Sequence, residues 1–190
     1  MPTIIDEGQL RFTFPNLWQA VQYDAAEFYR MHIIPTAANL KAVDFIAIPH
    51  PELNSLLMVE VKDFRGHAAE NENRIVTGDL VLEVVEKAMH TLSAIYLVKY
   101  CGDHELSNFV TKALTPPAKI ELVLFMEEDT ITVLHRNDTR GKLRKLRKEQ
   151  RINDMTLSLR QKLKNTVGIR SKVRNTETIE TREGFTVVPI

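Results

Sequence analysis

The chain has 190 residues, 44% of them hydrophobic, and its equal numbers of acidic and basic residues give a formal net charge of zero. This length suits one domain with a sizeable core, and the single Cys101 excludes an internal disulfide. The first ten residues lack the basic start and apolar run of a signal peptide, and no window reaches the roughly 20 apolar residues of a membrane span. We therefore expect a cytoplasmic protein without a membrane segment.

The zero net charge hides an uneven distribution along the chain. Residues 136–174 contain 14 Lys or Arg against three acidic residues, a net charge of +11, which leaves −11 for the remainder. Clustered cations displace the counterions that condense on phosphates, so this segment predicts contact with nucleic acid. The alternative is that the basic segment lies across the acidic body or forms a solvated helix face. The predicted nucleic-acid-binding residues are Arg140, Lys142, Arg144, Lys145, Arg147, Lys148 and Arg151.

The N-terminal region predicts a strand followed by a helix. Residues 10–14 alternate apolar and polar side chains, as a short strand does, and Pro15 ends the pattern. Asn16 with Gln19 three residues later resembles a capping box, which predicts a helix from there to about Met31.

Two apolar strands follow, over residues 42–48 and 55–62. The six residues between them are turn-like, which favours an antiparallel hairpin. The polar, glycine-bounded stretch 65–78 predicts a loop. A helix is expected next over about 79–100, with Gly102 well placed to end it.

The second half of the chain continues with strands and then the basic segment. Residues 119–126 predict a buried strand, and residues 130–136 are its expected hairpin partner. The basic segment has helical composition and is expected to break near Asn153. The tail, residues 176–190, predicts two short strands around a turn at residues 182–184. We assign residues 1–135 to a core and residues 136–190 to a basic helical segment and C-terminal strands that pack on or extend it.

Three charged residues interrupt the two apolar strands of the hairpin. Asp44 lies in one strand and Glu60 and Lys62 lie in the other, where an ionised side chain costs several kcal/mol unless it is paired or binds a metal. Strand side chains alternate between faces, so Glu60 and Lys62 point to one side while Val59 and Val61 point to the other. The neighbouring antiparallel strand can place Asp44 beside them.

This arrangement has the chemistry of a metal site that hydrolyses phosphodiesters. Two close carboxylates repel unless a cation lies between them, and hard oxygen ligands suit Mg²⁺ or Mn²⁺. Such an ion polarises a phosphoryl oxygen and activates a water, while Lys62 orients the nucleophile or stabilises the developing charge. The alternative is a salt bridge of Lys62 with Asp44 or Glu60 in a protein without catalysis.

The order helix, strand with Asp44, strand with Glu60-Val61-Lys62, helix and strand resembles the PD-(D/E)XK nuclease superfamily, over roughly residues 16–126. The resemblance implies a restriction-endonuclease-like α/β fold, in which a central mixed sheet is flanked by helices. It also implies that Asp44 and Glu60 bind the metal and that Lys62 is the catalytic lysine. An acid on the first helix often completes the metal site in that superfamily. Glu27 matches this position best, with Asp24 and Gln22 as competitors.

The leading hypothesis is therefore a metal-dependent nuclease that cuts DNA by an Mg²⁺-activated water, with the basic segment holding the phosphate backbone and a homodimer spanning both strands. The second hypothesis is a catalytically inactive nuclease-fold protein that serves as a nucleic-acid-binding or assembly subunit. The third is a regulatory protein that uses its acidic body and basic segment for protein contacts.

Overall fold

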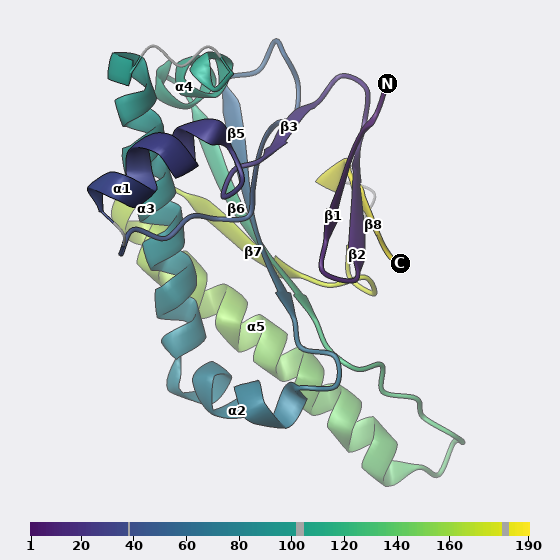
Figure 1. Ribbon diagram of the computed structural model, residues 1–190. Coiled ribbons are helices and arrows are strands. Elements are labelled where there is room, and N and C mark those ends of the chain that lie inside the picture. The colour runs from purple at the N-terminus through teal and green to yellow at the C-terminus, as the bar shows by residue number, and fades with distance from the viewer. Residues whose placement is uncertain (38, 102–104, 180–182) are drawn as a thin grey trace.

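The computed structural model describes residues 1–37, 39–101, 105–179 and 183–190, and its centre is a mixed five-stranded sheet (Figure 1). The strand order is β3-β4-β5-β6-β7, with antiparallel pairing from β3 to β5 and parallel pairing from β5 to β7. The strands are β3 (Gln19–Gln22), β4 (Phe45–Ile48), β5 (Ser55–Asp63), β6 (Lys119–Glu127) and β7 (Arg170–Arg174). The α/β class and a mixed sheet flanked by helices are thereby confirmed.

A small antiparallel sheet covers one face of the large sheet (Figure 1). Its order is β1-β2-β8, so the C-terminal strand pairs with the N-terminal hairpin. Aromatic rings fill the space between the two sheets, since the ring of Phe12 lies 5.0 Å from that of Phe45 and 5.3 Å from that of Phe125. The strand predicted over residues 10–14 is confirmed as β2. The bounds are β1 (Thr3–Glu7), β2 (Leu10–Phe14) and β8 (Thr186–Pro189).

The helices cover the opposite face of the large sheet (Figure 1). Val84 and Ile95 of the central helix α3 and Leu159 of α5 pack in one core with Met58 and Leu124 of the sheet. All five side chains are fully buried, so both helices are part of the core. The helices are η1 (Tyr29–Ile33), α1 (Ile34–Thr36), α2 (Ala68–Thr77), α3 (Asp79–Cys101), α4 (Ser107–Leu114) and α5 (Thr139–Val167). Among the described residues, no helix is both long enough and apolar enough to cross a membrane.

The hairpin of β4 and β5 forms as predicted, and its alternation sets the direction of the charged side chains. Leu57 and Val59 pack toward the small sheet, whereas Leu56 and Met58 pack toward the helices. Because β5 is continuous through Asp63, Glu60 and Lys62 continue the row that faces the helices.

The helix predicted from Asn16 to about Met31 is wrong for its first half. Residues 19–22 form β3, and Ala20 packs toward the small sheet while its neighbour Val21 packs toward the helices. This two-residue period is that of a strand, and the pairing of β3 with β4 outweighs the local capping signal. Helical backbone runs only over residues 27–36.

The loop predicted over residues 65–78 is also wrong, because most of it forms α2. Its Ala, Glu and Arg residues favour a helix, and the side chain of Ile75 anchors it to the core. Gly78 joins α2 to α3 with a φ of 83°, a backbone conformation that glycine adopts without strain. The helix predicted over about 79–100 is confirmed as α3, and Gly102 lies outside the described residues.

The strand predicted over residues 119–126 is confirmed as β6, but its expected partner is not a strand. Residues 130–136 instead lead away from the sheet to α5. That helix continues through Asn153 without the expected break, because Met155, Leu159 and Leu163 bury a continuous stripe against the core. Residues 136–190 extend the core, since β7 joins the large sheet and β8 joins the small one.

Among the described residues of the tail, one of the two expected strands is present. Residues 176–178 make a turn, and β8 is the single strand of this region among the described residues. Of the turn predicted at residues 182–184, residue 182 lies outside the described residues.

Candidate functional site

The hairpin brings the three charged residues of the sequence motif together on the helix side of the sheet. Asp44 lies immediately before β4, one residue beyond the pair that Phe45 forms with Val59. Its Oδ2 accepts a hydrogen bond from the backbone N–H of Val61 at 2.6 Å. On β5 itself, Lys62 Nζ lies 2.8 Å from Glu60 Oε1. Both carboxylates and the lysine therefore share one small region.

Helix α3 adds two charged side chains that the sequence motif does not include. Lys87 Nζ lies 2.6 Å from Glu60 Oε1 and 3.8 Å from Asp44 Oδ1. Glu83 accepts a hydrogen bond from Lys62 Nζ at 2.9 Å through one oxygen and pairs with Arg74 of α2 through the other. These contacts form a network of alternating charges between the sheet and two helices.

A sequence signal for Lys87 does exist. Leu80, Val84 and Thr91 are buried on α3, and Lys87 lies in the same row at spacings of three and four residues. A lysine in a buried helical stripe needs a partner, just as the charges in the apolar strands do. Its partner is Glu60, which lies 27 residues earlier in the chain.

Glu60 is the most unusual residue of the network. Its side chain is fully buried, and one oxygen accepts both ammonium groups while Oε2 has no hydrogen-bond partner among the described residues. Burial raises the pKa of Glu60, the charge of Asp44 raises it further, and the two lysines only partly offset these effects. The carboxylate is thus held in the interior at a free-energy cost, and its second oxygen is unpartnered among the described residues.

The other charged groups respond in ways that follow from their partners. The pKa of Asp44 is raised, chiefly by burial, although the N–H of Val61 and the charge of Lys87 lower it. Burial alone would lower the pKa of Lys62, but the charges and hydrogen bonds of Glu60 and Glu83 outweigh it and raise the pKa. Lys62 therefore stays a cation at neutral pH.

Two more carboxylates approach the network from other segments. Glu7 ends β1 and accepts a hydrogen bond from the side chain of Gln22 at 3.1 Å. Asp24 lies in the turn after β3, and its Oδ1 is buried without a hydrogen-bond partner among the described residues. Burial raises the pKa of both, and their charges also raise the pKa of Asp44. Together with Asp44, Glu60 and Glu83, five carboxylates of the described residues thus lie near Lys62 and Lys87.

Glu27, the acid predicted on the first helix, is placed differently from Asp24, one of its two competitors. Glu27 is exposed at the start of the helical segment, and the hydrogen bonds and ion pairs of the network run through other residues. Asp24 is half-buried and acts electrostatically on Asp44. Asp24 is therefore better positioned than Glu27 to extend the site.

The carboxylates of this region are of the chemical type that binds a hard divalent cation. The carboxylate oxygens of Asp44 and Glu60 are of the type that Mg²⁺ and Mn²⁺ prefer, and the unpartnered Oε2 of Glu60 is a buried acceptor that such an ion would satisfy. In the described part of the chain, however, no three His, Cys, Asp or Glu side chains lie close enough to form a metal-binding group. The two ammonium groups neutralise the carboxylates where that group would form.

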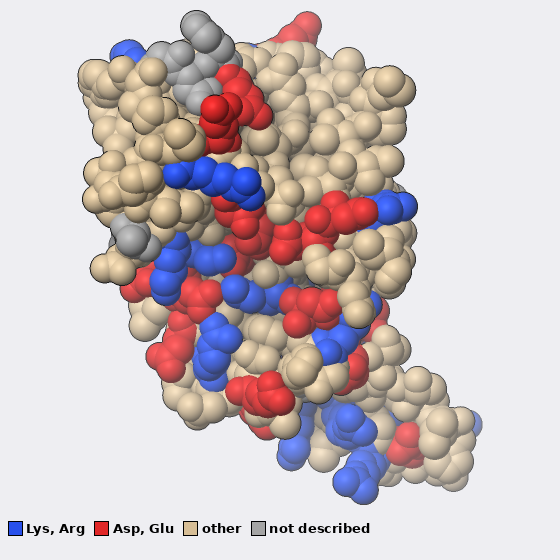
Figure 2. All heavy atoms as spheres, in the orientation of Figure 1, with Lys and Arg blue, Asp and Glu red and all other residues tan. Residues whose placement is uncertain are grey.

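The predicted nucleic-acid-binding residues lie on the N-terminal half of α5, which projects beyond the sheet (Figure 1). Asp138 caps this helix by accepting a hydrogen bond from the N–H of Gly141 at 2.8 Å. Figure 2 shows Lys and Arg gathered at this projecting end, whereas positive and negative side chains are interleaved on the body above it. The exposed members of the predicted set, which we call the basic arm, are Arg140, Lys142, Arg144, Lys145 and Arg147.

The last two members of the set are used within the protein. Lys148 is buried and donates hydrogen bonds to the backbone carbonyls of Glu128 and Asp129. Arg151 forms an ion pair with Glu128 at 2.9 Å. The intramolecular alternative for the basic segment therefore describes these two residues and also Lys172 and Arg174, which pair with Glu183, whereas the cations of the basic arm are exposed.

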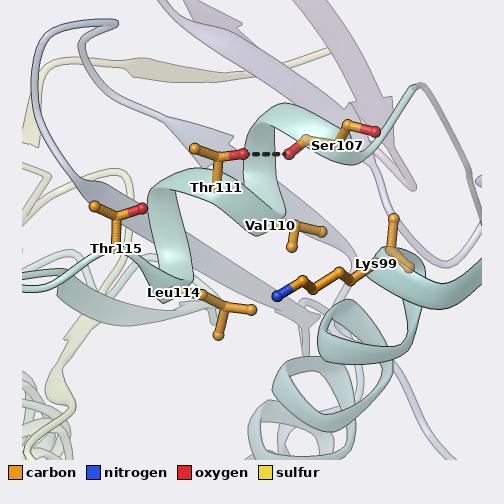
Figure 3. A pocket seen from close by; sticks show the side chains of 7 residues that line it. Lys99, Ser107, Val110, Thr111, Leu114 and Thr115 are labelled. Carbon is orange, nitrogen blue, oxygen red and sulfur yellow. Dashed lines mark hydrogen bonds between the residues drawn. The ribbon is translucent and has the colours of Figure 1, made fainter.

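A separate hollow of about 420 Å³ lies between α3 and α4, away from the charge network (Figure 3). Val110 and Leu114 line it together with the hydroxyl-bearing Thr111, and the Lys99 side chain extends toward α4. Among its lining residues, Lys99 is the only one with an ionisable side chain. The hollow therefore lacks the paired acids and bases of the network.

Comparison with protein-family models, with curated proteins and with solved structures finds no match for this chain.

Proposed function

We propose that this protein is a metal-dependent nuclease with a restriction-endonuclease-like core, acting on DNA. The observation that carries the proposal is the convergence of Asp44, Glu60 and Lys62 on one side of a buried hairpin. The strand arrangement supports it, because the antiparallel β3-β4-β5 unit is followed by α3 and by β6 parallel to β5. From β4 onward these elements follow the order on which the resemblance to the PD-(D/E)XK superfamily rests, whereas β3 takes the place of the first half of the expected helix.

Asp44 and Glu60 would hold Mg²⁺ or Mn²⁺, which when bound polarises a phosphoryl oxygen and lowers the pKa of a water. Glu60 contributes a carboxylate that burial keeps from bulk water, and the N–H of Val61 fixes the orientation of Asp44. Lys62 stays charged between Glu60 and Glu83, so its role is to stabilise negative charge on the phosphate and not to take a proton.

The basic arm supplies the second half of the proposal. Its five exposed cations lie on a helix that projects from the body, where they can follow a phosphate backbone. A homodimer would allow two sites to address the two strands of a duplex.

The direct test is incubation of supercoiled, linear and branched DNA and of RNA with Mg²⁺ or Mn²⁺. We expect the wild type to cleave DNA and the variants Glu60→Ala and Lys62→Ala to be inactive, while Glu52→Ala, which changes an exposed carboxylate, retains activity. Cleavage that survives both site changes would refute the assignment of the site.

The arm has its own test, in which the dependence of DNA affinity on salt is measured. Replacing Arg144 and Arg147 by Gln should make the negative slope of log affinity against log salt shallower by about 0.9 for each phosphate that the variant no longer neutralises. The same charge change at Arg160 and Lys164, which are exposed on the other half of α5, is the matched control. An equal effect of both pairs would show that net charge acts and not the arm.

One observation favours a second candidate function, an inactive nuclease-fold protein that binds nucleic acid. Glu60 already has two ammonium partners, which is the arrangement of a permanent ion-pair network. In that case the wild type binds DNA through the basic arm without cleaving it in either metal.

A further inference from the structure

Lys87 lies in the place between the two carboxylates that the proposed metal would take. Its ammonium group lies 2.6 Å from Glu60 Oε1 and 3.8 Å from Asp44 Oδ1, so one cation interacts with both carboxylates. Only 16% of its side chain is exposed. The lysine and a divalent ion therefore compete for the same oxygens.

The two lysines of the network differ in what remains to them if a cation binds Glu60. Lys62 has a second partner in Glu83 at 2.9 Å, and it can keep that partner. The second contact of Lys87 is with Asp44, which is the other carboxylate that the cation would take. A cation bound by both carboxylates would thus leave Lys62 its partner Glu83 and would take both partners of Lys87.

Other acidic groups are available to a released Lys87. Glu7 from β1 and Asp24 from the turn after β3 both have pKa values that the charge of Lys87 lowers, so both lie within electrostatic range of it. A rotation of the Lys87 side chain can therefore exchange one set of carboxylates for another.

We propose that Lys87 is an internal competitor that holds the site closed without metal and moves off Glu60 and Asp44 when a divalent cation binds. This inference rests on the proposed function, because it regulates that same site. In the metal-free state the ammonium group stabilises two buried carboxylates that would otherwise repel each other. The apparent metal affinity equals the intrinsic affinity multiplied by the fraction of molecules in which Lys87 has left the site.

The test is a titration of the metal-free protein with Mn²⁺, followed by calorimetry and by electron paramagnetic resonance of the free ion. We expect Lys87→Met to bind Mn²⁺ more tightly than the wild type, by about tenfold if Lys87 occupies the site about nine-tenths of the time. Lys99→Met removes an exposed charge from the same helix, so it is the control and should bind as the wild type does.

Thermal unfolding provides a second readout on the same samples. In EDTA, Lys87→Met should have a lower melting temperature than the wild type. Addition of Mn²⁺ should raise the melting temperature of Lys87→Met by more than it raises that of the wild type. If Lys87→Met does not fold without metal, Lys87→Gln removes the charge and keeps a polar side chain for the same titration.

The outcomes separate this inference from the proposed function. Wild-type Mn²⁺ binding that is lost in Glu60→Gln but unchanged in Lys87→Met would overturn the role of Lys87 and leave the metal site standing. Binding by Lys87→Met and not by the wild type would support the competitor and favour an inactive wild-type protein. Absence of Mn²⁺ binding in all variants would overturn both.

Discussion

Replacing Glu60 by Gln should stabilise the metal-free protein, although it abolishes the proposed activity. The side chain is fully buried, and burial raises the pKa of its carboxyl beyond what the two lysines offset. Ionisation of Glu60 therefore costs more in the folded state than in the unfolded chain, and a neutral amide of the same shape removes that cost at neutral pH.

The size of the effect follows from two opposing contributions. The amide oxygen can still accept from Lys62 and Lys87, but each hydrogen bond falls from about 1.5–3 kcal/mol for a charged acceptor to about 0.5–1.5 kcal/mol for a neutral one. Against this decrease stands the desolvation of an ionised carboxylate, which is several kcal/mol in a protein interior. We expect a net gain of about 1 kcal/mol, which raises the melting temperature by about 2–4 °C for a protein of this size.

Removing a cation of the network by Lys62→Met should instead destabilise the protein. Lys62→Met leaves the buried Glu60 with Lys87 as its remaining ammonium partner, and breaking a buried ion pair from one side costs about 3–5 kcal/mol. The raised pKa of Lys62 agrees with this sign, because its charged form is stabilised by folding.

Urea unfolding in EDTA at neutral pH measures both free energies without interference from metal. We expect Glu60→Gln to be more stable than the wild type and Lys62→Met to be less stable. If Glu60→Gln is instead less stable by more than about 1 kcal/mol, the ion pairs exceed the desolvation cost. Glu60 would then be a structural partner of the lysines and not a carboxylate held for another ligand.

Three further outcomes test other parts of the structure. Leu159→Ala should lose about 2–5 kcal/mol in urea unfolding because Leu159 is fully buried, whereas the exposed Leu157→Ala should change little. The hydrogen bonds of Arg65 hold the pKa of Asp63 below its ordinary value. The free energy of unfolding of the wild type should therefore exceed that of Arg65→Met by up to about 1 kcal/mol above about pH 4, and this difference should disappear as the pH falls through the lowered pKa of Asp63. A difference that grows on acidification would contradict this assignment. Mg²⁺ at about 100 times its Kd should add about 2.7 kcal/mol to the unfolding free energy of the wild type and nothing to that of Glu60→Gln, as calorimetry can check.

The direction of the charged side chains in the hairpin follows from the sequence alone. A strand has a period of two residues, so the apolar row of Leu57 and Val59 places Glu60 and Lys62 together on the other face wherever the strand lies. The short connection between two apolar strands likewise predicted their antiparallel pairing, which brings Asp44 beside them. These features are local, and local periodicity is sufficient to encode them.

The groups that meet those charges depend instead on how distant segments pack. The row of Lys87 on α3 is visible in the sequence, but its contact with Glu60 depends on how the helix lies over the sheet. Residues 19–22 became a strand because an edge of the sheet was free to pair with them, against their local helix signal. The same packing divided the basic segment into an exposed arm and the internal cation Lys148. A buried charge is evident in the sequence, but its partner comes from a distant segment, so only the packed fold specifies it.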